Sequence, residues 1–275
     1  MRLKRGLGLL VGLLVLFLVV KETREPYLWL FVDDWIHAKP PPQTLPLGED
    51  LALRLYADPR PHVGKIARLQ KGAVLVVDDQ ELIEEGFGFG LPLIEVAGQA
   101  YLSRSAIVER VDSTLVKHYE MDTLDTPSGF LRRKYEPVAS IGTVVVSYTV
   151  GAQSVVVEVD LSGLETTWNR AYLMNEQGAG AFTRYEEAGL VAEGEQLGKW
   201  QLTEARTGCI VAEDGSVRFC VETEQESPRY YGRERYRQYY WVGVYALSWA
   251  GIDLELEPPL TRFQYDIAVE TPDRD

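Results

Sequence analysis

Residues 141–159 read IGTVVVSYTVGAQSVVVEV, and they indicate the fold class more clearly than any other part of the chain. Two runs rich in β-branched residues, 141–150 and 154–159, flank the short sequence Gly151-Ala152-Gln153. β-Branched side chains favour strands because they are stiff and pack well on a pleated surface. Two such runs separated by three residues that include a glycine predict an antiparallel hairpin.

The same period-two alternation continues on both sides of this hairpin. Residues 51–55 alternate leucine with less apolar residues, and Ala97-Gly98-Gln99 between 91–96 and the run from Tyr101 predicts a second hairpin. Helical periodicity is scarce, and residues 186–195 could hold one short helix at most. Further strands are expected at 73–77, 168–174, 200–203, 208–212, 217–221, 236–249, 252–256 and 263–269.

Strands at this density are typical of sandwiches and barrels. The chain has 275 residues, of which 46% are hydrophobic and 25% charged, so it can bury a sizeable core. We therefore predict an all-β domain, a large antiparallel β-sandwich of two packed sheets, with a closed barrel as the alternative.

The N-terminus predicts a membrane anchor in front of this domain. Residues 6–20 form an unbroken apolar run of 15 residues, preceded by Arg2, Lys4 and Arg5. A basic segment followed by an apolar one is typical of export signals. A spanning helix needs about 17–25 residues, and the stems of flanking basic side chains such as Lys21 can make up the difference. No cleavage pattern of small residues follows, so we favour an uncleaved transmembrane signal-anchor over a cleaved signal peptide.

The distribution of basic residues predicts the orientation of this helix. The three basic residues in front of the run have no acidic neighbours, whereas Lys21 and Arg24 behind it are interleaved with Glu22 and Glu25. The positive excess keeps the N-terminus cytoplasmic. The expected location is therefore the cell membrane, crossed once, with the C-terminal domain outside the cytoplasm.

The domain boundaries follow from these segments. Prolines at 40, 41, 42 and 46 favour an extended, semi-rigid spacer. The apolar sequence 27–32 before it could lie at the membrane interface or form the first strand. We expect a basic tail at 1–5, the signal-anchor at 6–20, a juxtamembrane segment and linker at 21–47, the β-domain at 48–270 and a tail at 271–275.

The two cysteines, Cys209 and Cys220, lie on either side of a second turn signal, Asp214-Gly215. If these two residues form the turn, residue 211 faces 218 and Cys209 faces Cys220 directly. Counting from a two-residue turn places the cysteines at a hydrogen-bonded pair, the wider kind. We predict a disulfide, with two buried thiols as the alternative. No metal site is expected, because two cysteines without a neighbouring histidine cannot complete a zinc shell.

The net charge is −13, and without the first 20 residues 25 basic residues face 41 acidic ones, a net charge of −16. Such a surface repels phosphates over a Debye length. The composition therefore argues against a nucleic-acid partner and is compatible with solubility alone.

An arginine-aromatic segment is the strongest candidate for a binding site. In a strand, Arg233, Arg235, Arg237, Tyr239 and Trp241 share one face. Guanidinium groups bind carboxylate, sulfate or phosphate, while aromatic rings stack on sugars. The alternative is a solvated strand face whose arginines pair with surplus acids and whose aromatics lie in the core.

Catalytic motifs are absent from the sequence. It has no GxSxG or HExxH motif, and the glycine-rich residues 86–90 do not have GxGxxG spacing. His118 with Glu120 and Asp122 could hold a metal or a base, and Glu176 could be a catalytic acid or a sugar ligand; a structural histidine and an ordinary turn are the alternatives. The catalytic residues stay unassigned, and no cofactor is expected.

These observations lead to three hypotheses of function. The first is a membrane-anchored extracytoplasmic binding or structural module of the cell envelope, with a carbohydrate as its ligand. The second is a carbohydrate-active enzyme, a glycan hydrolase, lyase or epimerase, with unassigned carboxylates. The third is an accessory subunit that docks on a membrane partner. A groove with paired carboxylates would favour the enzyme, and a flat apolar patch would favour docking.

Overall fold

The computed structural model describes residues 40–62, 67–83, 86–127, 133–151, 154–178, 181–193, 201–203, 206–212, 214–223, 229–240 and 243–271. Every regular element in these ranges is a β-strand, as predicted. Across the same ranges, no helix combines the length and the apolar character needed to cross a membrane. The basic tail at 1–5 and the signal-anchor at 6–20 lie outside the described residues.

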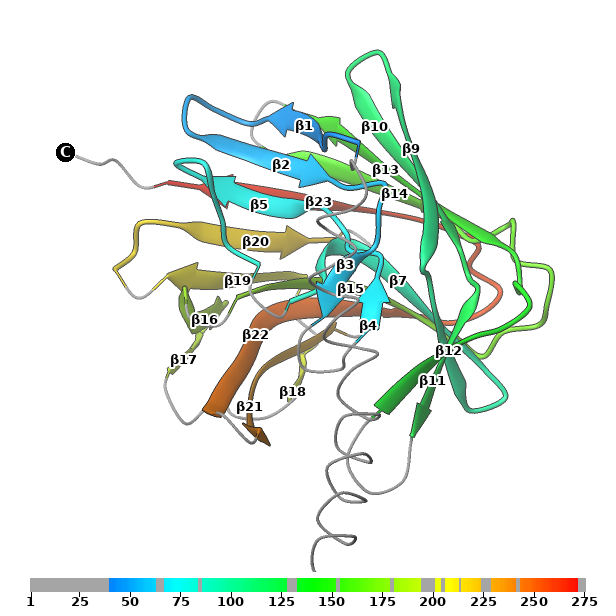
Figure 1. The fold of residues 1–275 in the computed structure, drawn as a ribbon. Helices are drawn as coiled ribbons and strands as arrows, with labels where there is room; N and C mark the ends of the chain where they lie inside the picture. Colours follow the sequence, from blue (N-terminus) through cyan, green and yellow to red (C-terminus); the bar gives the residue numbers. More distant parts are fainter. Residues whose placement is uncertain are drawn as a thin grey trace, which may run out of the picture.

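The largest sheet has nine antiparallel strands (Figure 1). In spatial order they are β17 (Leu190–Glu193), β16 (Phe182–Glu187), β19 (Thr207–Ala212), β20 (Arg218–Glu222), β23 (Arg262–Glu270), β14 (Val155–Asp160), β13 (Thr143–Val150), β10 (Thr114–Glu120) and β9 (Ser105–Val111). The hairpin predicted at 141–159 is β13 and β14, in which Val150 pairs with Val155.

A second sheet has eight antiparallel strands. In order they are β12 (Arg133–Pro137), β11 (Thr123–Pro127), β8 (Gln99–Leu102), β7 (Gly88–Val96), β15 (Arg170–Gly178), β22 (Gly243–Leu256), β21 (Arg229–Tyr240) and β18 (Gln201–Thr203). The second predicted hairpin is β7 and β8, where Val96 pairs with Gln99. The described sheets do not close on themselves, so the closed barrel is not the architecture found.

A smaller sheet lies in front of the nine-stranded one in Figure 1. Its four strands are β1 (Gln43–Pro46), β2 (Leu51–Leu55), β5 (Val74–Val77) and β6 (Gln80–Glu81), and β3 (Arg60–His62) pairs separately with β4 (Ala67–Leu69). β1 lies inside the segment 21–47 that we expected to be spacer. Its inclusion in a sheet shows that the described domain begins to pair at Gln43.

The two large sheets face each other across the core. The ring of Phe89 in the eight-stranded sheet meets that of Phe219 in the nine-stranded sheet edge-on, with centroids 5.0 Å apart. Tyr265 donates a hydrogen bond from β23 to Oδ1 of Asn175 on β15, at 2.8 Å. Fully burying an apolar side chain such as Phe89 stabilises a fold by about 1.5–3 kcal/mol. The alternation that predicted the strands is thus satisfied by inter-sheet packing.

Asn175 also lies at an irregularity in the eight-stranded sheet. The pairing of β15 with β7 shifts between Met174 and Asn175. The side-chain Nδ2 of Asn175 donates hydrogen bonds to the carbonyl oxygens of Leu173 and Ile252. Its Oδ1 accepts a hydrogen bond from the backbone amide of Gly90. These bonds tie the Asn175 side chain to backbone groups on both strands that pair with β15 and on β15 itself.

A buried lysine joins the small sheet to the large one. Lys117 on β10 is fully buried, and its Nζ donates to the carbonyl oxygens of Tyr56 and Lys71, both at 2.7 Å. Tyr56 follows β2, and Lys71 precedes β5. Burial lowers the pKa of Lys117 well below its usual value. The amine therefore ties the segment after β2 and the segment before β5 to β10.

One sequence-based expectation is wrong, and the short helix that the sequence allowed at most is not found in the described residues. Residues 236–249 are not one strand, because Tyr240 pairs with Gly243 and the chain reverses between β21 and β22. The described part of 186–195 holds no helix: Glu187 pairs with Leu190 across a turn in which Gly189 has a φ of 80°. In both places strand pairing uses residues whose local pattern gave no turn signal that we recognised.

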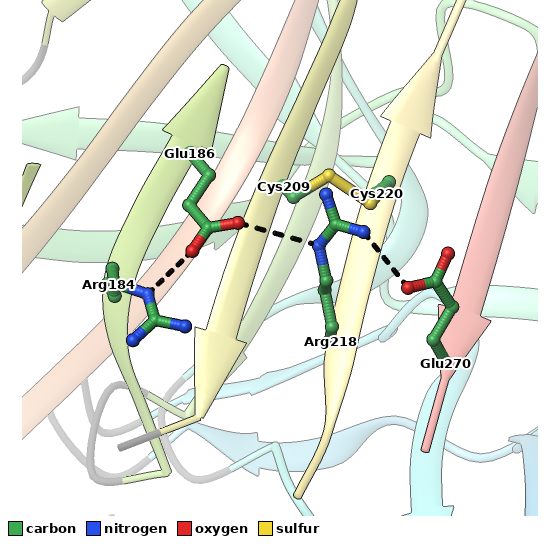
Figure 2. Close-up of a disulfide and its surroundings, with 6 residues drawn as sticks. All are labelled: Arg184, Glu186, Cys209, Arg218, Cys220 and Glu270. Atoms are coloured by element: carbon green, nitrogen blue, oxygen red, sulfur yellow. Dashed lines mark hydrogen bonds and ion pairs between the residues drawn. A yellow bond between two sulfur atoms is a disulfide. The ribbon is translucent and has the colours of Figure 1, made fainter. Parts of the chain in front are cut away.

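The predicted disulfide is present, and Figure 2 shows it between β19 and β20. Cys209 pairs directly with Cys220, as expected, but their Cα atoms are 4.0 Å apart, which fits a non-hydrogen-bonded pair of about 4.5 Å. The expected hydrogen-bonded pair is therefore wrong. The Ala212 amide donates a hydrogen bond to the Val217 carbonyl, so the pair that closes the loop is 212 and 217. Hydrogen-bonded and non-hydrogen-bonded pairs alternate from there, which makes Cys209 and Cys220 a non-hydrogen-bonded pair.

Candidate functional site

A row of acidic residues lies on the face of the eight-stranded sheet that points away from the nine-stranded sheet. Asp253, Glu255 and Glu257 alternate with apolar residues along and just beyond β22. The intervening Leu254 is fully buried, and Ile252 points toward β19, where its δ-methyl group approaches Gly208. Because side chains of a strand alternate between faces, the three acids share the opposite, outer face. We call these three residues with Glu176 on β15 the acidic row.

Two members of the acidic row form a buried carboxyl pair. Glu176 is 2% exposed and Asp253 is 3% exposed. The amide of Asn175 donates to Asp253 Oδ1 at 2.9 Å, and the amide of Phe87 donates to Glu176 Oε2 at 3.3 Å. Burial, followed by the charge of Glu176, raises the pKa of Asp253 well above its usual value. This environment favours the neutral form of Asp253 more than an exposed site would, because burial and a like charge both disfavour ionisation.

Arg170 links the row to the surface. Its Nε lies 3.2 Å from Glu255 Oε1 and 3.8 Å from Glu257 Oε1. A hydrogen bond with Tyr172, and then the charge of Glu255, raise the pKa of Arg170 above its usual value. Tyr172 and Glu255 are direct partners in the pairing of β15 with β22. The strand register thus places the guanidinium over the outer end of the row.

An open pocket of about 500 Å³ lies at this end. It is lined by Glu95, Ala97, Gly98, Asn169, Arg170, Glu257 and Pro258. Pockets that hold small molecules have volumes of about 300–1,000 Å³. Its lining is mostly polar, which distinguishes it from the mainly apolar sites of lipophilic ligands.

The walls of the pocket are fixed by backbone geometry. Ala97 and Gly98 have φ angles of 51° and 78°, which form the tight turn between β7 and β8. Asn169 Oδ1 accepts a hydrogen bond from the Ala97 amide at 2.7 Å, and the Asn169 amide donates to the Glu95 carbonyl at 2.8 Å. The start of β15 is therefore tied to the hairpin, and Glu95 and Arg170 are direct strand partners.

The chemistry of the pocket is that of hydrogen bonding to hydroxyl groups. Glu95 and Glu257 supply acceptors, and Arg170 and Asn169 carry donors. Within the described ranges, His, Cys, Asp and Glu side chains do not gather in threes as a metal site would require. The arrangement can orient a small polar ligand, with the buried carboxyl pair further along the same face.

The arginine-aromatic residues lie elsewhere on the same sheet. Arg233, Arg235, Arg237 and Tyr239 are in β21, at register positions opposite Ala250, Ser248, Ala246 and Val244 of β22, without a bulge. The backbone gives the uninterrupted strand that the prediction needs. Trp241 lies outside the described residues, as do the side chains of the other four, so the shared binding face stays a prediction.

The other candidates are not among the residues that line the pocket. His118 lies on the outer side of the nine-stranded sheet, with Nε2 3.8 Å from Glu109 Oε2. Asp122 is occupied by hydrogen bonds from the Arg104 amide and the Ser105 hydroxyl. Glu176, which we considered as a turn residue, lies in β15 and belongs to the acidic row.

Sequence reasoning missed Glu95, Asn169, Arg170 and the alternating acids of β22. A signal for the acids is present in residues 252–257, IDLELE, where every second residue is acidic. In a half-buried strand this pattern predicts one acidic face. No sequence signal links that face to Arg170 or to the 95–98 turn, because strand pairing alone brings them together.

Comparisons with known proteins identify no family. No protein-family model and no curated protein matches the chain. Among solved structures, a 4-alpha-glucanotransferase from Thermococcus litoralis has a TM-score of 0.45 at 8% identity, covering 85% of this chain and 40% of that one. Heparinase III has a TM-score of 0.39 at 8% identity, covering 80% and 33%. A galactose mutarotase-like protein from Lactobacillus casei has a TM-score of 0.38 at 10% identity, covering 84% and 99%.

Proposed function

We propose that this chain is a membrane-anchored extracytoplasmic β-sandwich module of the cell envelope that binds a carbohydrate in the pocket at Glu95, Arg170 and Glu257. The observation that carries the proposal is a polar pocket of about 500 Å³ whose side chains offer both acceptors and donors. Sugar hydroxyl groups need both, because each one donates and accepts hydrogen bonds.

The location has separate support. A disulfide between Cys209 and Cys220 is typical of proteins from oxidising compartments. The basic and apolar residues at 1–20 provide the export signal and the anchor. A reporter fused after Asp275 tests this part: protease added to intact cells is expected to reach it, and a protected, cytosolic reporter would contradict it.

The binding experiment is a glycan array followed by calorimetry with the best ligand. Arg170→Met and Glu257→Gln are each expected to weaken binding by about 5- to 150-fold, because a polar ligand group left without its partner costs about 1–3 kcal/mol. Glu109→Gln is the matched control, since Glu109 and Glu257 have similarly exposed side chains, 57% and 66%. Binding that survives both pocket substitutions, or no binding to any glycan, would overturn the proposal.

The enzyme hypothesis has weaker support from the geometry. Asp253 and Glu176 hydrogen-bond to each other and are buried. Glycosidases instead hold their two carboxyl groups about 5 Å or more apart on either side of the scissile bond. The buried pair therefore does not provide the two separated carboxyl groups that a glycosidase uses.

One observation favours the docking hypothesis as a second candidate. Ile107 and Val111 on β9, the outermost described strand of the nine-stranded sheet, are 62% and 55% exposed. Exposed apolar side chains on an edge strand are typical of contact surfaces. Ile107→Glu would release the chain from an envelope complex without changing glycan binding if this surface docks.

A further inference from the structure

The disulfide lies on the solvent side of its sheet and is nevertheless covered. Phe219 and Val221 alternate with Cys220 along β20 and face the core, so Cys220 and its partner Cys209 face outward. Yet the two cysteines are only 2% and 3% exposed. Some outer-face side chains must therefore lie over the S–S bond.

Charged side chains surround the disulfide on this face (Figure 2). Arg218, two residues before Cys220 on the same face, has Nη1 2.9 Å from Glu270 Oε2 on β23. Its Nε lies 3.7 Å from Glu186 Oε2 on β16, an ion-pair contact that is longer than a hydrogen bond. Glu186 in turn lies 2.7 Å from Arg184 Nε. We call Arg184, Glu186, Arg218 and Glu270 the charge ladder.

The contact between Arg218 and Glu186 must cross a strand. The sheet order is β16, β19, β20, so β19 separates the two residues. Neighbouring strands are about 4.8 Å apart, which places the backbones of β16 and β20 about 10 Å from each other. Glu186 is the direct strand partner of Cys209. The ion pair therefore extends over the outer face of β19, at the position of the disulfide.

We propose that the charge ladder is a lid that controls how fast thiols reach the Cys209–Cys220 disulfide. Reduction requires a thiolate in line with the S–S bond, so a covered disulfide reacts only when its cover opens. The ladder is held by partly exposed ion pairs, which are weak and are screened by salt. Opening of the lid is thus a local event, separate from unfolding of the sandwich.

The reaction that tests the lid is reduction by dithiothreitol. One thiolate of the reagent attacks Sγ of Cys209 or Cys220, the S–S bond breaks, and the released cysteine thiolate takes up a proton. The second thiolate of the reagent closes its own ring disulfide and releases the other cysteine. Two electrons pass from the dithiol to the protein. The reaction is stopped at successive times, and mass spectrometry measures the fraction of protein with both cysteines reduced.

Arg218→Ala, which removes the centre of the lid, is expected to speed reduction by about three- to tenfold, and Glu186→Gln by a smaller factor, as loss of weak ion pairs implies. Arg262→Ala is the matched control, because Arg262 also forms an ion pair on this sheet, with Asp160, at the opposite end of β23 from Glu270. We expect the control to react at the rate of the unsubstituted protein.

Urea separates the lid from global unfolding. Local opening exposes little surface, so the accelerated rate of Arg218→Ala should be nearly independent of low urea concentrations. An unchanged rate in Arg218→Ala would overturn the proposal. So would an acceleration that rises with urea as steeply as unfolding does, since the disulfide would then be reached only through the unfolded state.

Discussion

The outer faces of the two large sheets use charged residues in opposite ways. On the eight-stranded sheet, Asp253 and Glu176 are buried side by side, and burial followed by the charge of Glu176 raises the pKa of Asp253. On the nine-stranded sheet, Arg218 and Glu186 are about one-third exposed and of opposite sign, and the Cys209–Cys220 disulfide lies on the same face. Exposed side chains of opposite charge form ion pairs beside the disulfide, whereas the burial of two neighbouring carboxyl groups raises the pKa of Asp253.

The disulfide face is expected to show the larger loss of stability. Changing Cys209 and Cys220 together to alanine should lower the free energy of unfolding by about 3 kcal/mol, because an open chain gains the entropy that a closed loop of this length forbids. Urea unfolding at neutral pH measures the loss. A loss below 1 kcal/mol would mean that the pairing of β19 with β20 keeps most of the stability of the fold without the disulfide.

On the acidic face, Asp253→Ala should lower the free energy of unfolding by about 2 kcal/mol, because it leaves the buried backbone amide of Asn175 without its acceptor. Glu222→Ala on the other face is the matched control, since Glu222 is an exposed acid in a strand and should change stability by about 0.5 kcal/mol or less. Equal losses of unfolding free energy in Asp253→Ala and Glu222→Ala would mean that the buried acid contributes no more to stability than an exposed one.

A smaller effect is expected in the pH dependence of stability. The pKa of Asp253 is raised in the folded state, so its contribution is fully present below the unfolded pKa and is lost as pH rises through the folded pKa. Asp253→Asn, which does not titrate, should therefore show a shallower decline of unfolding free energy above pH 4. Parallel curves for the two proteins would indicate that the pair does not hold its proton.

The sequence predicted much of the fold because strand signals are local. The β-branched runs at 141–150 and 154–159 form β13 and β14, and the turn at Ala97 and Gly98 joins β7 to β8. The pairing of Cys209 with Cys220 was also predicted, because register follows from the position of a turn. Whether that pair is hydrogen-bonded or non-hydrogen-bonded was predicted wrongly, since this depends on whether the loop has two residues or four.

The candidate site could be predicted only in part. The alternation of acids at 253, 255 and 257 is visible in the chain, but nothing local indicates that Glu176 lies beside Asp253. Those two residues are 77 positions apart and meet because β15 pairs with β22. The same pairing brings Arg170 to Glu255 and forms the pocket with the hairpin turn at Ala97.

The sequence by itself determined the strand class, two hairpins and the partners of the disulfide, because these depend on side-chain periodicity and turn chemistry over a few residues. Only the tertiary structure decided which acids are buried together, which arginine lies beside the disulfide and where the pocket opens. The physical reason is that burial and ion pairing depend on distances between strands remote in the chain, which no local pattern specifies.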